Sequence, residues 1–200
     1  MKTFPARFIF SFIFVISLLS VQPSLPARAQ SEKISFAVIG DYGLAGQNEA
    51  DVANLVKSWN PDFIVTVGDN NYNDGSAWSI DQNIGQYYHD YIYPYTGKYG
   101  TGSPIRRFFP SLGNHDYGGD TDANAYFKYF GFYKQESFYD FVQGPVHFFI
   151  VNSNKEEPDG YNATSTQAKW LKKSDDRFHL QIQCGGIPSS SLLFRQAWLQ

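Results

Sequence analysis

The chain has 200 residues, of which 18% are aromatic and 18% charged, and its formal net charge is −3. This length can bury a substantial core, most simply as one domain, and the aromatic content excludes a disordered chain. The charge excludes the basic stripe that a nucleic-acid partner requires, and the single cysteine, Cys184, excludes an intrachain disulfide framework.

The N-terminus has the pattern of a secretory signal peptide. Lys2 and Arg7 precede an apolar run over residues 8–21, and Ala27-Arg28-Ala29 follows. This order of basic flank, short apolar run and small residues predicts cleavage between Ala29 and Gln30. The run is shorter than the ~20 residues that span a bilayer, which disfavours the alternative of an uncleaved anchor. We therefore expect residues 1–29 to be a signal peptide, and the mature protein to be secreted or periplasmic and without a membrane segment.

Three apolar runs predict strands, and each ends in a loop that begins with Gly and carries polar side chains. The runs are residues 34–39, 63–67 and 105–112. The loops that follow them are Gly40-Asp41-Tyr42-Gly43, Gly68-Asp69-Asn70-Asn71-Tyr72 and Gly113-Asn114-His115-Asp116. Ligand groups gather outside the carboxyl ends of strands in open α/β sheets, so we expect these loops to form one site.

The segment between the first two strands predicts a helix. Val52, Leu55, Val56 and Trp59 recur at helical spacing within residues 47–59, and we expect them to form the buried face. A strand, a helix and a second strand make a βαβ unit, so the sheet has a parallel part. The fold class is therefore α/β.

The remaining elements follow from local patterns. Residues 76–102 predict a helix and then a loop, with Tyr-rich residues 87–99 serving mainly in packing or, alternatively, lining a sugar or nucleoside pocket. Residues 123–130 predict a short helix, and residues 137–142 and 146–152 an antiparallel hairpin. Thr164 and Gln167 have capping-box spacing at the start of a last helix.

The two strand-end aspartates indicate a metal site. Asp41 and Asp69 at neighbouring strand ends would repel each other unless a proton or a cation lies between them. Tyr72, Asn114, His115 and Asp116 add a phenol, an amide, an imidazole and a third carboxylate to the same edge; these are the six candidate site residues. Two metal ions about 3.5–4 Å apart can hold a phosphate and generate a hydroxide nucleophile.

The three loop motifs, in this order and spacing, resemble those of the calcineurin-like metallophosphoesterases. Their Gly-Asp-Tyr-Gly and Gly-Asp-Asn-Asn-Tyr forms resemble the purple acid phosphatase branch and, within it, the small tartrate-resistant type. The resemblance covers about residues 34–173, and it implies an α/β/β/α sandwich of mixed sheets. It also implies phosphate monoester hydrolysis by a metal-bound hydroxide. Most metallophosphoesterases have His two residues after the first Asp, where this chain has Gly43.

The resemblance also implies a role for each site residue. Asp41 and Tyr72 would bind Fe(III), Asp69 would bridge both metals, and Asn114 would bind the divalent ion, which is Fe, Zn or Mn. His115 would face the phosphoryl oxygens or protonate the leaving group, and Asp116 would orient His115 from behind. Small phosphorylated molecules would be the substrates.

The C-terminal residues depart from the family pattern. The family has an apolar strand ending in His and then Gly-His-x-His, and neither follows Lys173. We therefore expect a metallophosphoesterase domain over residues 30–173 that lacks the C-terminal part of the fold, and an aberrant tail over residues 174–200. A frameshift explains this tail: one codon choice for residues 184–200, read one nucleotide later, gives apolar residues and then His-His-Pro-Pro. A divergent or truncated tail is the alternative.

Three functional readings follow. The leading one is an exported acid phosphatase-like metalloenzyme, with little activity expected of the 200-residue chain because later His ligands are lacking. The second is a phosphodiesterase or nucleotidase on the same metal core. The third is a secreted, non-catalytic binding protein that uses the Tyr-rich surface of residues 87–99.

Overall fold

The structure of the protein is a computed structural model that describes residues 33–118, 122–132 and 137–177. The expected signal peptide, residues 1–29, lies outside the described residues. Residues 178–200 of the expected tail do so as well, whereas residues 174–177 are the end of the last helix. Within the described ranges, no helix is long and apolar enough to cross a membrane.

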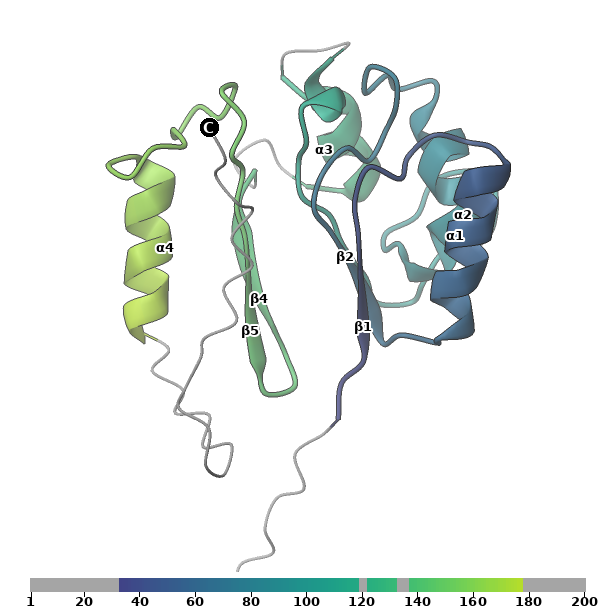
Figure 1. Ribbon diagram of the computed structural model, residues 1–200, viewed down its shortest axis with the longest axis horizontal. Helices are drawn as coiled ribbons and strands as arrows, with labels where there is room; N and C mark the ends of the chain where they lie inside the picture. Colours follow the sequence, from purple (N-terminus) through teal and green to yellow (C-terminus); the bar gives the residue numbers. More distant parts are fainter. Residues whose placement is uncertain (1–32, 119–121, 133–136, 178–200) are drawn as a thin grey trace, which may run out of the picture. The chain divides into compact units, whose positions relative to one another are not determined.

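A parallel three-stranded sheet holds the predicted site. Its strands are β1 (Phe36–Ile39), β2 (Phe63–Thr66) and β3 (Phe108–Phe109), in the order β1-β2-β3. Phe36 pairs with Phe63, and Ile64 with Phe108. The helix α1 (Gln47–Ser58) connects β1 to β2, which confirms the βαβ unit. All three carboxyl ends therefore lie at one edge of the sheet (Figure 1).

Side chains alternate between the two faces of this sheet, because successive residues of a strand point to opposite sides. Ala37 and Ile39 of β1 and Ile64 of β2 join the larger core, which the helices cover. Phe63 and Val65 of β2 join a second core on the opposite face. The central strand β2 is thus buried on both faces, as strands of parallel sheets usually are, whereas Val38 of β1 is 41% exposed.

The helical face is built from α1, a short helical stretch and α3. The stretch comprises a π-helical turn (η1, Asp81–Gly85), α2 (Gln86–Tyr88) and a 3₁₀ turn (η2, His89–Tyr91), and a loop follows it. The predicted short helix is α3 (Asn124–Phe130). Tyr87, Tyr88 and Tyr91 are buried, so packing is confirmed as the role of these three tyrosines.

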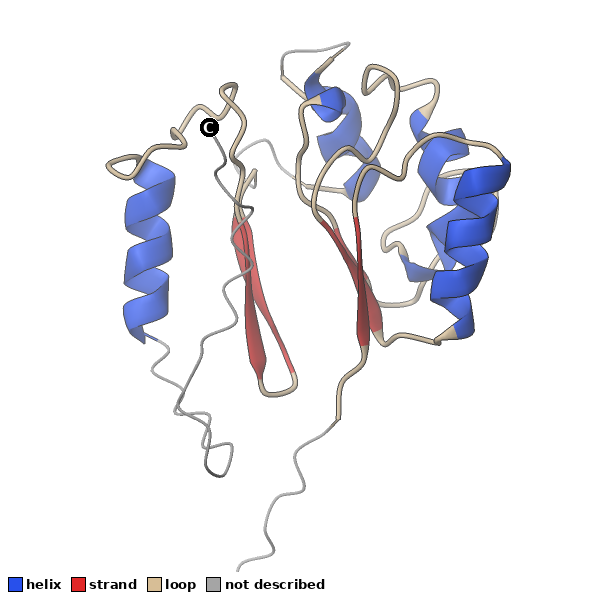
Figure 2. Ribbon diagram, in the orientation of Figure 1, coloured by secondary structure: helices blue, strands red, loops and turns tan. Residues whose placement is uncertain are grey.

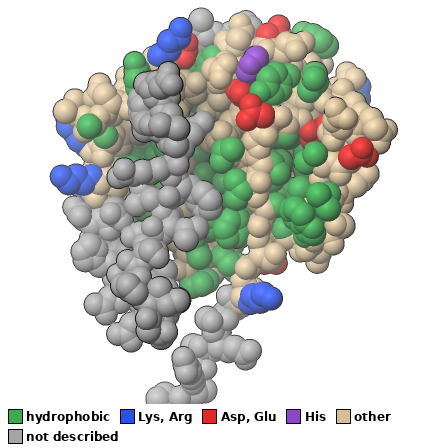
Figure 3. Space-filling model, in the orientation of Figure 1, with side chains coloured by type: hydrophobic (Ala, Val, Ile, Leu, Met, Phe, Trp, Pro, Cys, Tyr) green, Lys and Arg blue, Asp and Glu red, His purple; other side chains and the backbone are tan. Residues whose placement is uncertain are grey.

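The predicted buried face of α1 is wrong in three of its four residues. Val56 is buried, but Val52, Leu55 and Trp59 are 43%, 54% and 58% exposed. Ala53 and Glu49 are buried instead. Figure 3 shows hydrophobic side chains at the surface over β1 and α1. The face of α1 that packs on the core is therefore the one that carries Glu49, Ala53 and Val56.

The predicted hairpin forms the second sheet. Strands β4 (Tyr139–Gln143) and β5 (Val146–Ile150) pair antiparallel. Phe148 and Ile150 lie in one core with Phe63, Val65 and Phe109, so the two sheets face each other. On the other side of the hairpin, Trp170 of α4 (Thr166–Arg177) contacts Phe138 and Phe149. The layers are thus helix, sheet, sheet, helix (Figure 2), and the α/β/β/α class is confirmed.

The predicted capping box of α4 is wrong. The hydroxyl of Ser165 accepts a hydrogen bond from Ala168 N at 3.1 Å, so Ser165 caps the helix. Gln167 is turned into the core, where its side-chain oxygen accepts from Asn152 N at 2.6 Å. Its amide nitrogen donates to Asn152 O at 2.8 Å. A tertiary contact thus replaces the local cap.

Candidate metal centre

The hydroxyl of Tyr72 lies between two aspartates at the carboxyl edge of the first sheet. It is 2.9 Å from Asp41 Oδ1 and 3.1 Å from Asp69 Oδ2. Burial and the two carboxylates raise the pKa of the Tyr72 phenol above its ordinary value. Because the phenol has one proton, it donates to only one carboxylate at a time. The second carboxylate therefore faces a lone pair of the phenol oxygen. A cation between them would relieve the resulting repulsion.

Both aspartates have left-handed backbone conformations, with φ of 52° for Asp41 and 53° for Asp69. Such angles are uncommon for residues other than glycine, and they concentrate at functional sites. They turn the chain sharply after β1 and β2, and Asp41 N then donates to Gly68 O at 3.3 Å. The sharp turns hold the two loops against each other.

The contact between the first two loops explains Gly43. A Cβ on Gly43 would lie only 1.7 Å from Asn70 O, which is less than any contact distance. Tyr72 N also donates to Gly43 O at 2.7 Å. A side chain at position 43 would therefore push the Tyr72 loop away from the Asp41 loop.

The third loop brings His115 to the same place. Its backbone N donates to Asp69 Oδ1 at 2.9 Å, and its ring centroid is 4.2 Å from that of Tyr72. Nδ1 is 2.6 Å from Asn73 O; since a carbonyl only accepts, Nδ1 carries a proton and Nε2 is left for another partner. Figure 3 shows a histidine side chain beside acidic side chains on the surface near the ends of the strands.

Asn114 precedes His115 and is exposed at the start of the 3₁₀ turn η3 (His115–Tyr117). No hydrogen bond is formed by its side chain with any residue that the structure describes. Its backbone oxygen accepts from Tyr117 N at 3.3 Å. The amide therefore has no hydrogen-bond partner among the described residues, and it is placed one residue from the Asp69–His115 contact.

The Asp116 carboxylate, expected to orient His115, forms its hydrogen bonds with other residues of the loops. The Asp116 carboxylate is 2% exposed, and it accepts hydrogen bonds from Gly113 N at 2.8 Å and Asn70 Nδ2 at 2.8 Å. Burial raises its pKa to about 6, and these hydrogen bonds oppose the rise. Asp116 therefore ties the second loop to the third, whereas Asn73 and Tyr72 set the position of the His115 ring.

Asn70 is the site residue that the sequence analysis missed. It is 0% exposed. Its Oδ1 accepts from Tyr42 Oη at 3.0 Å and Thr66 Oγ1 at 2.7 Å, and its Nδ2 also donates to Ser111 O at 2.6 Å. Asn70 thus joins the ends of all three strands. Its place inside a strand-end motif was visible in the sequence, but its partners lie up to 46 residues away.

The donor set fits a hard cation. Asp41, Asp69 and Tyr72 converge on one point, and their oxygens are ligands that iron and divalent ions accept. Within residues 33–118, 122–132 and 137–177, however, no three His, Cys, Asp or Glu side chains group closely enough to hold a metal ion. Among these residues the centre therefore depends on the phenol and the amide as much as on carboxylates.

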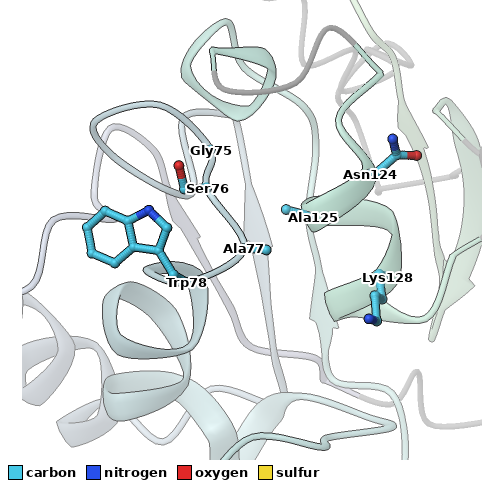
Figure 4. Close-up of a pocket in the computed structure, with 7 residues that line it drawn as sticks. All are labelled: Gly75, Ser76, Ala77, Trp78, Asn124, Ala125 and Lys128. Carbon is cyan, nitrogen blue, oxygen red and sulfur yellow. The ribbon is translucent and has the colours of Figure 1, made fainter.

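A pocket of about 460 Å³ lies between the loop that follows Tyr72 and α3. Its lining residues come from the loop after Tyr72 and from α3; they are Gly75, Ser76, Ala77, Trp78, Asn124, Ala125 and Lys128 (Figure 4). A Cβ on Gly75 would lie 2.5 Å from Asp116 O and 2.8 Å from His115 O, so this lining residue packs closely against the third loop. Trp78 at its rim is 81% exposed.

Comparison with known proteins gives the family. The model of the calcineurin-like phosphoesterase family matches residues 34–196. Purple acid phosphatase 17 of Arabidopsis thaliana is 32% identical over 120 residues, which cover 58% of this chain and 33% of that protein. Purple acid phosphatase 7 of the same plant is 33% identical over 105 residues, covering 49% and 30%.

A third relative, purple acid phosphatase 4 of Arabidopsis thaliana, is 34% identical over 119 residues, covering 53% of this chain and 33% of that protein. The chain thus spans about a third of the length of the curated relatives it matches. The family match covers the site loops, both sheets and α4. This chain belongs to the calcineurin-like phosphoesterase family.

Proposed function

We propose that this chain carries residues of an exported, binuclear-metal phosphoesterase site that acts on phosphate monoesters. The observation that supports the proposal is the convergence of Asp41, Asp69 and Tyr72 at the edge where three parallel strands end. The match to purple acid phosphatases supports the acid phosphatase class. Export rests on the N-terminal sequence pattern alone.

In the proposed centre, Asp41 and Tyr72 would hold Fe(III), Asn114 would hold a divalent ion, which is Fe, Zn or Mn, and Asp69 would serve both ions. Metal ions bound there would supply positive charge for the phosphoryl oxygens and an activated water. The protein itself contributes the positions of the ligand side chains. The left-handed turns at Asp41 and Asp69 fix both carboxylates before any metal arrives, which lowers the reorganisation that binding requires.

His115 is the proposed acid that serves the leaving group. Its Nδ1 proton is engaged by Asn73 O, which fixes the tautomer and directs Nε2 away from the loop. When the ring is doubly protonated, Nε2 donates to a phosphoryl oxygen or to the departing alkoxide. The backbone contact between His115 N and Asp69 Oδ1 keeps the imidazole next to the centre.

The test is a metal titration of the full chain with Tyr72→Phe as the matched variant. We expect Fe(III) to produce a visible charge-transfer band in the wild type and no such band in the variant. Asp51→Asn, on the exposed side of α1, serves as a control that keeps the band. Iron binding without a band in the wild type would refute Tyr72 as a ligand.

Activity is the second readout. The described residues supply no histidine ligand beyond the three loops, so we expect the 200-residue chain to turn over p-nitrophenyl phosphate slowly. Turnover at ordinary enzyme rates, about 1–10³ s⁻¹, would contradict this expectation. Loss of such turnover in the Asp69→Asn variant would nevertheless support Asp69 as part of the proposed centre.

A further inference from the structure

The turn that carries Asn114, His115 and Asp116 is held from the second sheet by two asparagines. Asn152 and Asn154 follow β5, and we call them the asparagine clamp. Asn152 Nδ2 donates to Tyr117 Oη at 2.8 Å, at the C-terminal end of the turn. Asn154 Nδ2 donates to Leu112 O at 3.1 Å, just before the turn begins. The clamp therefore grips both ends of the site loop.

The two asparagines also bind each other. Asn152 Oδ1 accepts from Asn154 N at 3.1 Å and from Asn154 Nδ2 at 2.8 Å. The second proton of Asn152 Nδ2 goes to Glu157 Oε2 at 2.7 Å. Because a carboxylate only accepts, this contact fixes which end of the Asn152 amide is nitrogen. All four hydrogen-bonding positions of a side chain that is 1% exposed are thus filled.

Behind the clamp lies α4. Gln167 makes paired hydrogen bonds to the backbone N and O of Asn152, at 2.6 and 2.8 Å. Tyr117, Glu157 and Gln167 are 7%, 4% and 5% exposed, so water competes little for these contacts. A chain of buried hydrogen bonds therefore runs from α4 through Asn152 to the loop of the proposed metal centre.

We infer that Asn152 and Asn154 are positioning residues for the phosphoesterase site, because they set the place of the Leu112–Tyr117 segment that presents Asn114 and His115. The expected effect on metal binding rests on the proposed function. The link between the two asparagines and the turn is supported by the hydrogen bonds alone. Neither asparagine forms a hydrogen bond with Asp41, Asp69 or Tyr72, so each acts through the turn. Outer groups that orient metal ligands typically change metal affinity 10–100-fold when they are removed.

The first test measures amide hydrogen exchange of the full chain in the variants Asn152→Ala and Asn154→Ala. We expect exchange in residues 113–118 to accelerate at least tenfold, while amides of β2 change less than twofold. Asn162→Ala, an exposed asparagine near α4 whose Oδ1 accepts from Thr164 N at 2.9 Å, is the matched control. Unchanged exchange in the turn, or equal acceleration in β2, would overturn the inference.

Tyr117→Phe, combined with Asn152→Ala, gives a double-mutant cycle. It distinguishes a direct link between Asn152 and Tyr117 from a general increase in flexibility of the turn. Tyr117→Phe removes only the hydroxyl that Asn152 holds, so the double variant with Asn152→Ala is expected to exchange no faster in the turn than Asn152→Ala alone. Multiplied effects of the two changes would contradict the direct link.

Zn²⁺ affinity, measured by competition with a chelator, is the readout for the metal centre. We expect it to weaken at least tenfold in Asn152→Ala and to stay unchanged in Asn162→Ala. If the wild type binds no metal, the proposed function fails, and the exchange experiment still decides the clamp. Metal binding of normal strength in Asn152→Ala would overturn its positioning role.

Discussion

Asn70 shows how one buried amide assembles the proposed centre. It bonds to groups at the ends of β1, β2 and β3 and has no exposed surface. Asn70→Ala would leave Ser111 O and one lone pair of Asp116 without their donor. We expect the free energy of unfolding to fall by about 3 kcal/mol, since each buried polar group left unsatisfied costs about 1–3 kcal/mol.

Urea denaturation at pH 7 measures the effect of Asn70→Ala. Asn54→Ala, at an exposed position of α1, is the control and should stay within about 0.5 kcal/mol of the wild type. A loss below about 1 kcal/mol for Asn70→Ala would show that the loops are held together by other contacts.

Glu49 makes stability depend on pH. It is 4% exposed, and Oε1 has no hydrogen-bond partner among the residues that the structure describes. Burial raises its pKa from 4.5 to about 7. The folded state therefore holds this proton more tightly than the unfolded state, so the contribution is complete below pH 4.5 and is lost as pH rises through 7.

Glu49→Gln tests this contribution, because glutamine keeps the shape without the titration. The stability of the variant relative to the wild type should rise by up to about 3 kcal/mol between pH 4 and pH 8. Urea denaturation at several pH values gives this difference and cancels the other titrating groups. A difference that does not vary with pH would show that Glu49 is solvated.

Sequence reasoning brought the candidate site residues together because strand ends converge in a predictable way. Asp41, Asp69 and Tyr72 each follow a recognisable strand, and the structure places them within hydrogen-bonding distance. The roles of Asp116 and Asn70 could not be read in this way. Their partners are set by how the loops fold onto each other, and no local pattern encodes contacts across 41 or 46 residues.

At the scale of elements, the hairpin is attached to the first sheet by aromatic rings. Phe148 is 5% exposed, and its ring centroid lies 5.1 Å from that of Phe36 and 5.4 Å from that of Phe63. Phe148→Ala would open a cavity between the sheets. We expect a loss of about 3–5 kcal/mol in the free energy of unfolding.

Thermal and urea unfolding would measure the Phe148→Ala effect. Val142→Ala lies on the same hairpin at a position that is 51% exposed, and it should cost less than about 1 kcal/mol. Equal losses for the two variants would mean that the interface between the sheets contributes little.

Element types followed from periodicity, but element orientations did not. The pattern predicted a helix over residues 47–59 and α1 spans Gln47–Ser58, yet the core accepts Ala53 and Glu49 rather than Leu55 and Trp59. A count of apolar residues does not show which face of the helix the core accommodates, and here that face carries Glu49, Ala53 and Val56. At α4, likewise, the spacing of Gln167 predicted a helix cap. Its side chain instead forms two hydrogen bonds with the backbone of buried Asn152.

At the scale of the whole molecule, the proposed centre couples metal binding to folding. Without a cation, the carboxylates of Asp41 and Asp69 share one phenol proton, and their repulsion opposes the folded state. A metal ion that binds only the folded chain stabilises it, by about 2.7 kcal/mol when its concentration is 100 times the Kd. Asp41 and Asp69 should thus lower the stability of the metal-free protein and raise the stability of the metal-bound protein.

Asp69→Asn separates these two effects. The amide oxygen still accepts from His115 N, as Asp69 Oδ1 does now, so the loop geometry is kept while one charge is removed. We expect the variant to be at least as stable as the wild type in EDTA and to lose most of the increase in Tm that excess Zn²⁺ gives the wild type. Asp51→Asn should behave as the wild type in both conditions. If Asp69→Asn destabilises the protein in EDTA and still gains the full Zn²⁺ effect, Asp69 is a structural residue and the metal binds elsewhere.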